Sequence, residues 1–312
     1  MLDSALRVRG HARHAATFDT LLGAALVFFW ASGFVVPRFF GPYVEPVTFV
    51  AARNVSAMVL LAIIAAAKRS PWPDQPSQWF GLMWAGLLFQ GIFLMAGYWS
   101  IFHGLPVATA ALIGALQPAL TAISAAWLLG ERIAPLQIAG MGLGLCGVGL
   151  VISPKLVDSH AGTAIGLALV CLIGVACAAY GSVYQKRYQS IGDNWSRTTL
   201  IFLGATILPV ISAPLMETLE VRWSAALIGV YLWAVVALSI GGTMALLTLI
   251  QKGQAARAAS LLYLVPPLSA AMAYVGFGER IHLVQVAGFL VTAAGVYLVQ
   301  KYAARAAAGA RA

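Results

Sequence analysis

The chain has 312 residues, of which 61% are hydrophobic and 9% charged, with a formal net charge of +9. A soluble globular domain carries about 25% charged residues, so this composition excludes that class and indicates an integral membrane protein. The basic residues stand singly between apolar segments, which is typical of loops held on one side of a bilayer. The sequence has no dense basic patch, so we expect no nucleic-acid partner.

Runs without charged residues predict the helices, because a membrane-spanning helix needs about 20 apolar residues. Ten helices are expected, over residues 20–37, 46–67, 79–102, 106–128, 135–153, 163–185, 198–216, 226–250, 256–277 and 283–300. Pro135 opens the fifth helix at a first-turn position, where a proline costs no hydrogen bond. The expected fold class is therefore an all-α membrane protein with ten transmembrane helices.

An internal repeat divides the chain into two halves. Residues 108–152 align without a gap with residues 256–300, at an offset of 148 and with 19 of 45 positions identical. The landmarks shared by the two copies are Pro118/Pro266, the Gly-Glu-Arg-Ile runs at 130–133 and 278–281, Gln137/Gln285 and Gly140/Gly288. Such self-similarity indicates a duplication. We expect a cytoplasmic tail (1–17), a first five-helix repeat (18–153), a linker (154–162), a second repeat (163–302) and a cytoplasmic tail (303–312).

The distribution of Lys and Arg predicts the orientation in the membrane. A cytoplasmic N-terminus places 14 of the 19 basic residues on the inner side and five on the outer side, so both termini are expected inside. Each half has five helices, and an odd number forces the second half to enter the membrane inverted. Inverted repeats are typical of secondary transporters, which bind substrate near the midplane between the halves.

Several motifs resemble those of EamA-type transporters in the drug/metabolite transporter superfamily. They are Trp30-Ala31-Ser32-Gly33-Phe34, Gln117-Pro118, Gly130-Glu131-Arg132, Pro266 and Gly278-Glu279-Arg280. The resemblance covers residues 18–302 and implies two five-helix repeats and export of amino acids, related metabolites or drugs. Some members of the family act as exchangers or facilitators. Val265 stands where the first half has Gln117, so any role of that amide is not duplicated.

No coenzyme fingerprint, Walker loop or HExxH motif is present, so we expect no catalytic residue, cofactor or metal. The candidates are polar and aromatic groups inside the spans, where an unpaired polar group is costly and tends to face a cavity. The substrate-binding candidates are Trp30, Gln90, Tyr98, Gln117, Tyr180, Tyr184 and Tyr263. The gating or coupling candidates are Arg38, Glu45, Arg53 and His103, and the helix-kink candidates are Pro118 and Pro266.

Gln117 stands in the middle of the fourth helix, immediately before Pro118. A proline has no N–H, so the carbonyl of Gly114 loses its helical donor and can face a ligand. The alternative is a structural kink with an interhelical hydrogen bond. In the third helix, the eight-residue spacing of Gln90 and Tyr98 predicts that they share a face; for Tyr98 an interfacial position is the alternative.

Arg53 is the one full charge well inside a predicted helix. It is expected to form an outer gate with Glu45 or the surroundings of Arg38, to attract a carboxylate substrate, or to extend to the headgroups. His103 is a candidate for proton coupling, because histidine is the residue type whose ordinary pKa lies closest to neutral pH, with helix capping as the alternative. The aromatic candidates have packing as their alternative.

The Glu-Arg pairs at 131–132 and 279–280 are interpreted as helix connectors, with each carboxylate near a helix N-terminus. The glycine series Gly140, Gly142, Gly144, Gly147 and Gly149 has the spacing of close helix contacts, either in a dimer or within its half.

The sequence therefore predicts a multi-pass inner-membrane secondary transporter that exports small metabolites, with amino acids or related compounds as the expected class, by alternating access. The expected partners are a small-molecule substrate and the lipid bilayer, and the protein is a monomer or a homodimer. The alternatives are a multidrug exporter, a metabolite importer, a non-transporting membrane sensor and an intramembrane enzyme. The predicted spans contain no Asp or Glu, which argues against an enzyme and against an exporter of cationic drugs.

Overall fold

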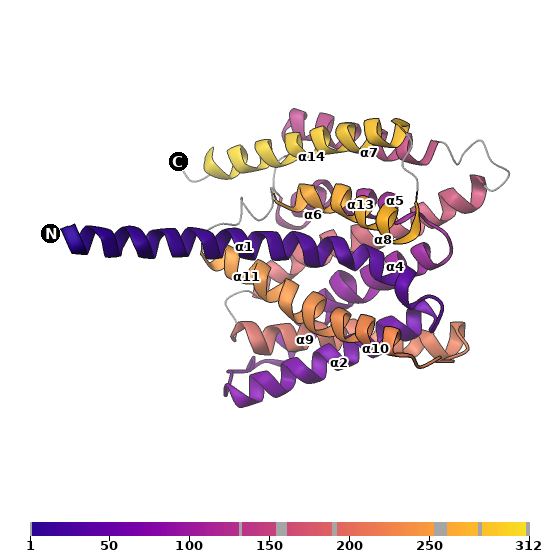
Figure 1. Cartoon of the computed structure of the whole chain (residues 1–312), viewed down its shortest axis with the longest axis horizontal. Coiled ribbons are helices and arrows are strands. Elements are labelled where there is room, and N and C mark those ends of the chain that lie inside the picture. Colours follow the sequence, from indigo (N-terminus) through magenta and orange to yellow (C-terminus); the bar gives the residue numbers. More distant parts are fainter. Residues whose placement is uncertain are drawn as a thin grey trace.

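The computed structural model describes residues 2–130, 133–153, 161–188, 192–252, 261–279 and 283–309 (Figure 1). Nearly all of these residues are helical. The β-type contact in this part of the chain is a single bridge between Val44 and Val221, in the loops after α1 and α9.

The first half contains α1 (Leu2–Phe40), α2 (Pro46–Ala67), α3 (Pro76–Gly86), the π-helix η1 (Leu87–Ile92), α4 (Phe93–Phe102), α5 (Val107–Gly114), α6 (Gln117–Leu129) and α7 (Pro135–Ile152). The second half contains α8 (Ala161–Gln185), the 3-10 helix η3 (Lys186–Tyr188), α9 (Asn194–Met216), α10 (Ala225–Leu232), the π-helix η4 (Trp233–Gly242), α11 (Thr243–Gln251), the 3-10 helix η5 (Leu262–Leu264), α13 (Val265–Phe277) and α14 (Leu283–Gly309).

Seven helical segments in the described part of the chain are long and apolar enough to cross a membrane. They are Thr20–Phe40, Pro46–Ala67, Pro76–Phe102, Val107–Leu129, Gly162–Tyr188, Asn194–Met216 and Ala225–Leu249. Three shorter apolar helices are Pro135–Val151, Val265–Phe277 and Leu283–Val299. The expected class, an all-α membrane protein, is confirmed. The number of ten spans stays a prediction, because these three helices are short for a full crossing.

The helices α7 and α14 lie side by side at one edge of the molecule, and α2 and α9 pack together at the opposite edge (Figure 1). Glycines allow α7 and α14 to approach closely: a Cβ on Gly140 would lie 2.6 Å from the carbonyl oxygen of Gly295, and one on Gly147 would lie 2.6 Å from that of Gly288. Gly140 and Gly147 thus pack the fifth helix against its counterpart from the other half. A Cβ on Gly144 would instead meet Leu116 of its own half, and Cβ atoms on Gly142 and Gly149 would meet nothing within 4 Å.

The ends of α2 and α9 are joined by two hydrogen bonds of the same kind. The Ser70 hydroxyl donates to the Asp193 carboxylate (2.6 Å), and the Thr218 hydroxyl donates to the Glu45 carboxylate (2.7 Å). Adding 148 to residue numbers 45 and 70 gives 193 and 218. Likewise, adding 148 to 140 gives 288, and subtracting 148 from 295 gives 147. The contact between Gly140 and Gly295 therefore recurs between Gly288 and Gly147. Each contact therefore occurs twice with the halves exchanged.

Two π-helical segments also recur at the same place in each half. When η4 is shifted back by 148 it spans residues 85–94, which cover η1 at Leu87–Ile92. Single π-helical turns inside α-helices are rare and are often found at functional sites. The two halves thus share an irregularity that their hydrophobic pattern does not reveal.

Candidate functional site

One cluster of buried apolar side chains joins five helices at the end of the molecule where α1 finishes. The helices are α1, α4, α5, α8 and α13, so both halves contribute. The buried members are Val35, Ile101, Leu105, Val107, Ala110, Ile113, Leu167, Ala168, Cys171, Val175 and Ala273. Because these side chains exclude water, the two halves are packed tightly together at this end.

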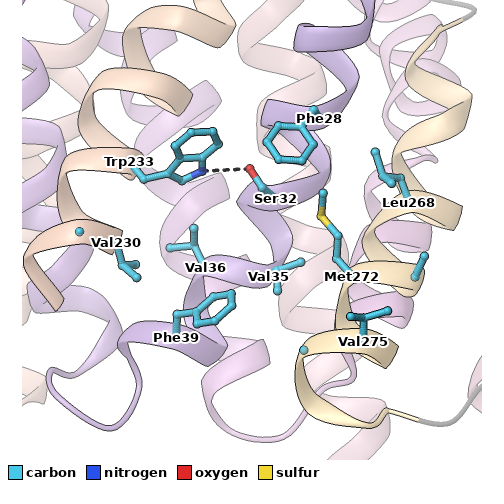
Figure 2. A pocket seen from close by; sticks show the side chains of 13 residues that line it. Phe28, Ser32, Val35, Val36, Phe39, Val230, Trp233, Leu268, Met272 and Val275 are labelled. Atoms are coloured by element: carbon cyan, nitrogen blue, oxygen red, sulfur yellow. Dashed lines mark hydrogen bonds between the residues drawn. The ribbon is translucent and has the colours of Figure 1, made fainter. Parts of the chain in front are cut away.

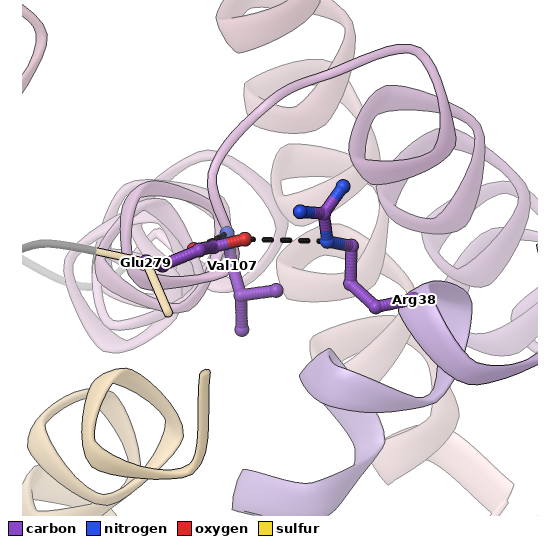
Figure 3. Close-up of polar contacts among 3 residues, drawn as sticks. All are labelled: Arg38, Val107 and Glu279. Carbon is purple, nitrogen blue, oxygen red and sulfur yellow. Dashed lines mark hydrogen bonds and ion pairs between the residues drawn. The ribbon is translucent and has the colours of Figure 1, made fainter. Parts of the chain in front are cut away.

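A polar contact lies beside that cluster (Figure 3). Arg38 Nε is 3.3 Å from Glu279 Oε1, and the backbone N–H of Val107 donates to Glu279 Oε2 over 3.2 Å. Val107 is the first residue of α5, so the carboxylate sits at a helix N-terminus, where the helix dipole favours negative charge. The guanidinium of Arg38 also lies over the Phe277 ring, 5.5 Å from its centroid. Glu279 thus caps a helix of the other half.

The other members of the two Glu-Arg pairs, Glu131, Arg132 and Arg280, lie outside the described residues. Glu45, a gating candidate, accepts hydrogen bonds from the backbone and the hydroxyl of Thr218, both over 2.7 Å. It therefore joins two loops, and Arg53 donates to Ser239 and Tyr98 instead, so an outer gate that involves Glu45 or the surroundings of Arg38 stays a prediction.

Arg53 is buried, with only 4% of the residue exposed. Its Nε donates to the Ser239 hydroxyl (3.0 Å) and its Nη1 donates to the Tyr98 hydroxyl (2.6 Å). The Ser239 hydroxyl in turn donates to the carbonyl of Ala234, five residues earlier, over 3.0 Å. Helices α2, α4 and η4 therefore converge on one cation, and they come from both halves. The side chain does not extend to the headgroups.

An apolar pocket of about 710 Å³ lies between α1, the α10–η4 junction and α13 (Figure 2). It is lined by Phe28, Ser32, Val35, Val36, Phe39, Gly229, Val230, Trp233, Leu268, Ala271, Met272, Val275 and Gly276. The Ser32 hydroxyl donates to the carbonyl of Phe29 (2.8 Å) and accepts from Trp233 Nε1 (3.1 Å). Since these side-chain polar groups are already paired, the pocket offers mainly hydrocarbon contact. Sequence reasoning missed it, because single apolar residues on three helices carry no motif.

Both proline positions coincide with breaks in helices. In the first half α5 ends at Gly114 and α6 begins at Gln117, with Pro118 as its second residue. In the second half η5 gives way to α13 at Val265, and Pro266 is again the second residue. The Gln117 side chain is partly exposed and its amide makes no hydrogen bond within the described part of the chain.

Gln90 and Tyr98 have different environments. Tyr98 is buried against Arg53, whereas Gln90 is partly exposed and lies within η1. The prediction of a shared face assumed an uninterrupted α-helix, with its 3.6 residues per turn. The i→i+5 pattern of η1 changes the angular position of every residue before it relative to those after it, which makes the eight-residue argument invalid here.

The aromatic candidates fall into two groups. Trp30 packs with Leu26, Leu249 and their neighbours, and its Nε1 would lie 3.3 Å from a Cβ on Gly242. Tyr180 and Tyr184 form a series along α8 that continues to Tyr188, with ring centroids 6.3 Å and 5.8 Å apart, and Trp127 of α6 lies 5.7 Å from Tyr180. The side chain of Tyr263 lies outside the described part of the structure.

His103 ends α4 and is exposed. Its Nδ1 is 2.8 Å from the carbonyl oxygen of Trp99, and the two ring centroids are 4.1 Å apart. This geometry corresponds to the helix-capping alternative. The structure thus brings Arg53 and Tyr98 together, joins Arg38 to Glu279 and stacks Tyr180 near Tyr184, but distributes the other described candidates over separate places.

Known proteins resemble this chain over almost its full length. The profile of the EamA-like transporter family matches residues 18–153 and 164–300. An "Uncharacterized transporter YvbV" of Bacillus subtilis is 27% identical, covering 91% of this chain and 92% of that protein. A "Probable amino-acid metabolite efflux pump" of Escherichia coli K12 is 26% identical, covering 90% of this chain and 94% of the pump. A crystal structure with a TM-score of 0.62 and 17% identity covers 90% of this chain and 96% of its own, and shows the same fold. Because the family profile covers most of both halves, the chain belongs to the EamA-like transporter family.

Proposed function

We propose that the protein is an inner-membrane secondary transporter that exports amino acids or related small metabolites by alternating access between two inverted five-helix halves. Membership of a transporter family supports transport, and the name of the Escherichia coli relative supports this substrate class. One observation carries the mechanism. Contacts between the two halves occur in pairs, and the residues of one contact are related to those of the other by 148 positions with the halves exchanged.

The proposed topology has ten spans, with both termini in the cytoplasm. Three spans would then be formed by helices that include the shorter apolar segments α7, α13 and α14. In this orientation the end of α1 is the outer end, so the buried cluster around Ala110 and the Arg38–Glu279 ion pair close the outer side. The described conformation is accordingly proposed to be closed to the outside.

Transport by purified protein in liposomes tests this function. Counterflow of each amino acid in a panel is measured with and without a pH gradient, and empty liposomes give the background. We expect uptake above background for at least one amino acid, and loss of uptake in Gln117→Ala at unchanged yield of folded protein. Loading from either side of oriented vesicles decides between export and import. If the wild-type protein moves none of the panel, the proposed substrate class is wrong.

The apolar pocket favours a second candidate function, the export of uncharged apolar compounds. Its volume of about 710 Å³ and its paired polar groups suit a hydrocarbon-rich molecule. The same liposomes loaded with an uncharged apolar dye test this alternative. Ala271→Trp, which fills the pocket, should stop dye movement and leave amino-acid counterflow intact if the two routes differ.

A further inference from the structure

Among the residues that the structure describes inside membrane-spanning helices, Arg53 is a buried cation that forms no ion pair. Arg53 is the eighth residue of α2, and a rise of about 1.5 Å per residue places it about 10 Å inside the helix start. Within the described residues no carboxylate pairs with it, since its hydrogen bonds go to two neutral hydroxyls. The nearby carboxylates Glu45 and Glu217 are bonded to the backbone at the loop ends instead. A buried charge without a counter-ion is strongly unfavourable for folding. Such a charge inside a membrane-spanning helix therefore indicates a functional role, such as binding an anionic ligand.

The hydroxyl partners hold the guanidinium in one orientation. Ser239 fixes Nε, Tyr98 fixes Nη1, and Tyr98 also presents its ring 5.7 Å from the guanidinium carbon. Ser239 is itself fixed by its bond to Ala234, which the π-helical turn brings within reach. Both hydroxyls are neutral, so these contacts fix the position of the guanidinium but leave its positive charge without a counter-ion.

One edge of the guanidinium remains available. Nη2 makes no hydrogen bond to any described residue. It is also not among the fully buried unpaired atoms, which include the neighbouring Asn54 Oδ1. Nη2 therefore retains contact with accessible space. A guanidinium presents parallel N–H donors that match the two oxygens of a carboxylate.

We propose that Arg53 binds the carboxylate group of the transported substrate, with Ser239 and Tyr98 as its positioning residues. The substrate class is therefore a carboxylic acid, and an amide or ester of the same compound is excluded. This inference rests on the proposed transport function for its physiological meaning, but binding of the carboxylate can be measured separately. Since Tyr98 and Ser239 come from opposite halves, the orientation of Arg53 depends on how the halves pack.

The test measures thermal unfolding of the purified protein with millimolar amino acids and with their amides as matched probes. The variants are Arg53→Met, Arg53→Lys, Tyr98→Phe and, as a control with the same chemical change at an exposed loop arginine, Arg222→Met. We expect the wild type and Arg222→Met to bind at least one free acid about 10- to 100-fold more tightly than its amide, the range for a hydrogen-bonded charge. Arg53→Met should lose this preference, whereas Arg53→Lys retains part of it and Tyr98→Phe weakens it.

Arg53 has no counter-ion among the described residues, so Arg53→Met removes the desolvation cost of the charge without leaving an opposite charge unpaired, and this variant is expected to fold. An acid-over-amide preference that persists in Arg53→Met overturns the assignment. The assignment is also overturned if the wild-type protein shows no preference for the acid over the amide, whatever the liposome experiment yields. Selective binding of acids through Arg53 without any counterflow would support the site and contradict the proposed transport function, so the two failures are distinguishable.

Discussion

Arg38 at the end of α1 and Glu279 after α13 connect the two halves across 241 positions of sequence, with 3.3 Å between Arg38 Nε and Glu279 Oε1. The Glu279 side chain is 18% exposed and also accepts from the first backbone N–H of α5. A single carboxylate therefore ties together α1, α5 and α13 next to the buried cluster that joins the halves.

Weakening this contact should open the adjacent end of the protein. In a cysteine-free background, Ala110→Cys places a thiol in the fully buried cluster one turn beyond Val107. We expect Glu279→Gln to increase its labelling by a membrane-impermeant maleimide about two- to fivefold, because a partly exposed ion pair contributes up to about 1 kcal/mol. Glu220→Gln, at an exposed loop carboxylate, serves as the control. Unchanged labelling would show that apolar packing alone closes this end.

Two glycines of α7 should respond oppositely to the same substitution. A Cβ on Gly147 would collide with Thr292 and with the Gly288 carbonyl oxygen, whereas one on Gly142 would meet nothing within 4 Å. Gly147→Ala should lower the free energy of unfolding by about 1–3 kcal/mol through overpacking. Gly142→Ala should be neutral or stabilising, because alanine favours the helix. Chemical unfolding in detergent measures both variants, and equal effects would contradict the α7–α14 packing.

Glu217 should stabilise the start of α2. Its carboxylate accepts from the backbone N–H groups of Val47 and Thr48 and from the Thr48 hydroxyl, all over 2.7 Å. Glu217→Ala leaves these donors without a protein partner, and the expected loss is about 1–2 kcal/mol of unfolding free energy, as for other N-terminal caps. The comparison is with Glu220→Ala, an exposed residue of the same loop. A loss no larger than that of the control would argue against the cap.

The Asp193 cap should be sensitive to acid. Burial raises the pKa of Asp193, but hydrogen bonds from Ser70, Ser196 and Trp195 outweigh this effect and hold the pKa below its ordinary value of 3.8. A lowered native pKa means that the ionised carboxylate contributes stability above the ordinary value and loses it as the pH falls through the native one. Melting temperatures of the wild type and Asp193→Ala should therefore differ at neutral pH and converge below pH 3.8. A difference independent of pH would exclude this role of the charge.

The sequence by itself determined the membrane class, the helical segments and the pairing of equivalent positions. Long stretches with few charged residues identify helices because lipid excludes charged groups. Thus α2 begins after Glu45 and ends before Lys68, although it contains Arg53. The matched prolines Pro118 and Pro266 mark equivalent helix breaks, because a missing N–H acts locally wherever it occurs. These features depend on neighbours within a few residues, so composition and spacing are sufficient to find them.

Only the tertiary structure decided which residues meet. Helical periodicity placed Gln90 beside Tyr98, but the π-helical turn of η1 separates their environments. The sequence singled out Arg53 as a charge inside a span, yet its partners Tyr98 and Ser239 lie 45 and 186 positions away. The apolar pocket likewise combines side chains from α1, η4 and α13. The physical reason is that such contacts are selected by how whole helices pack, and an offset of 148 relates equivalent residues without stating which of them touch.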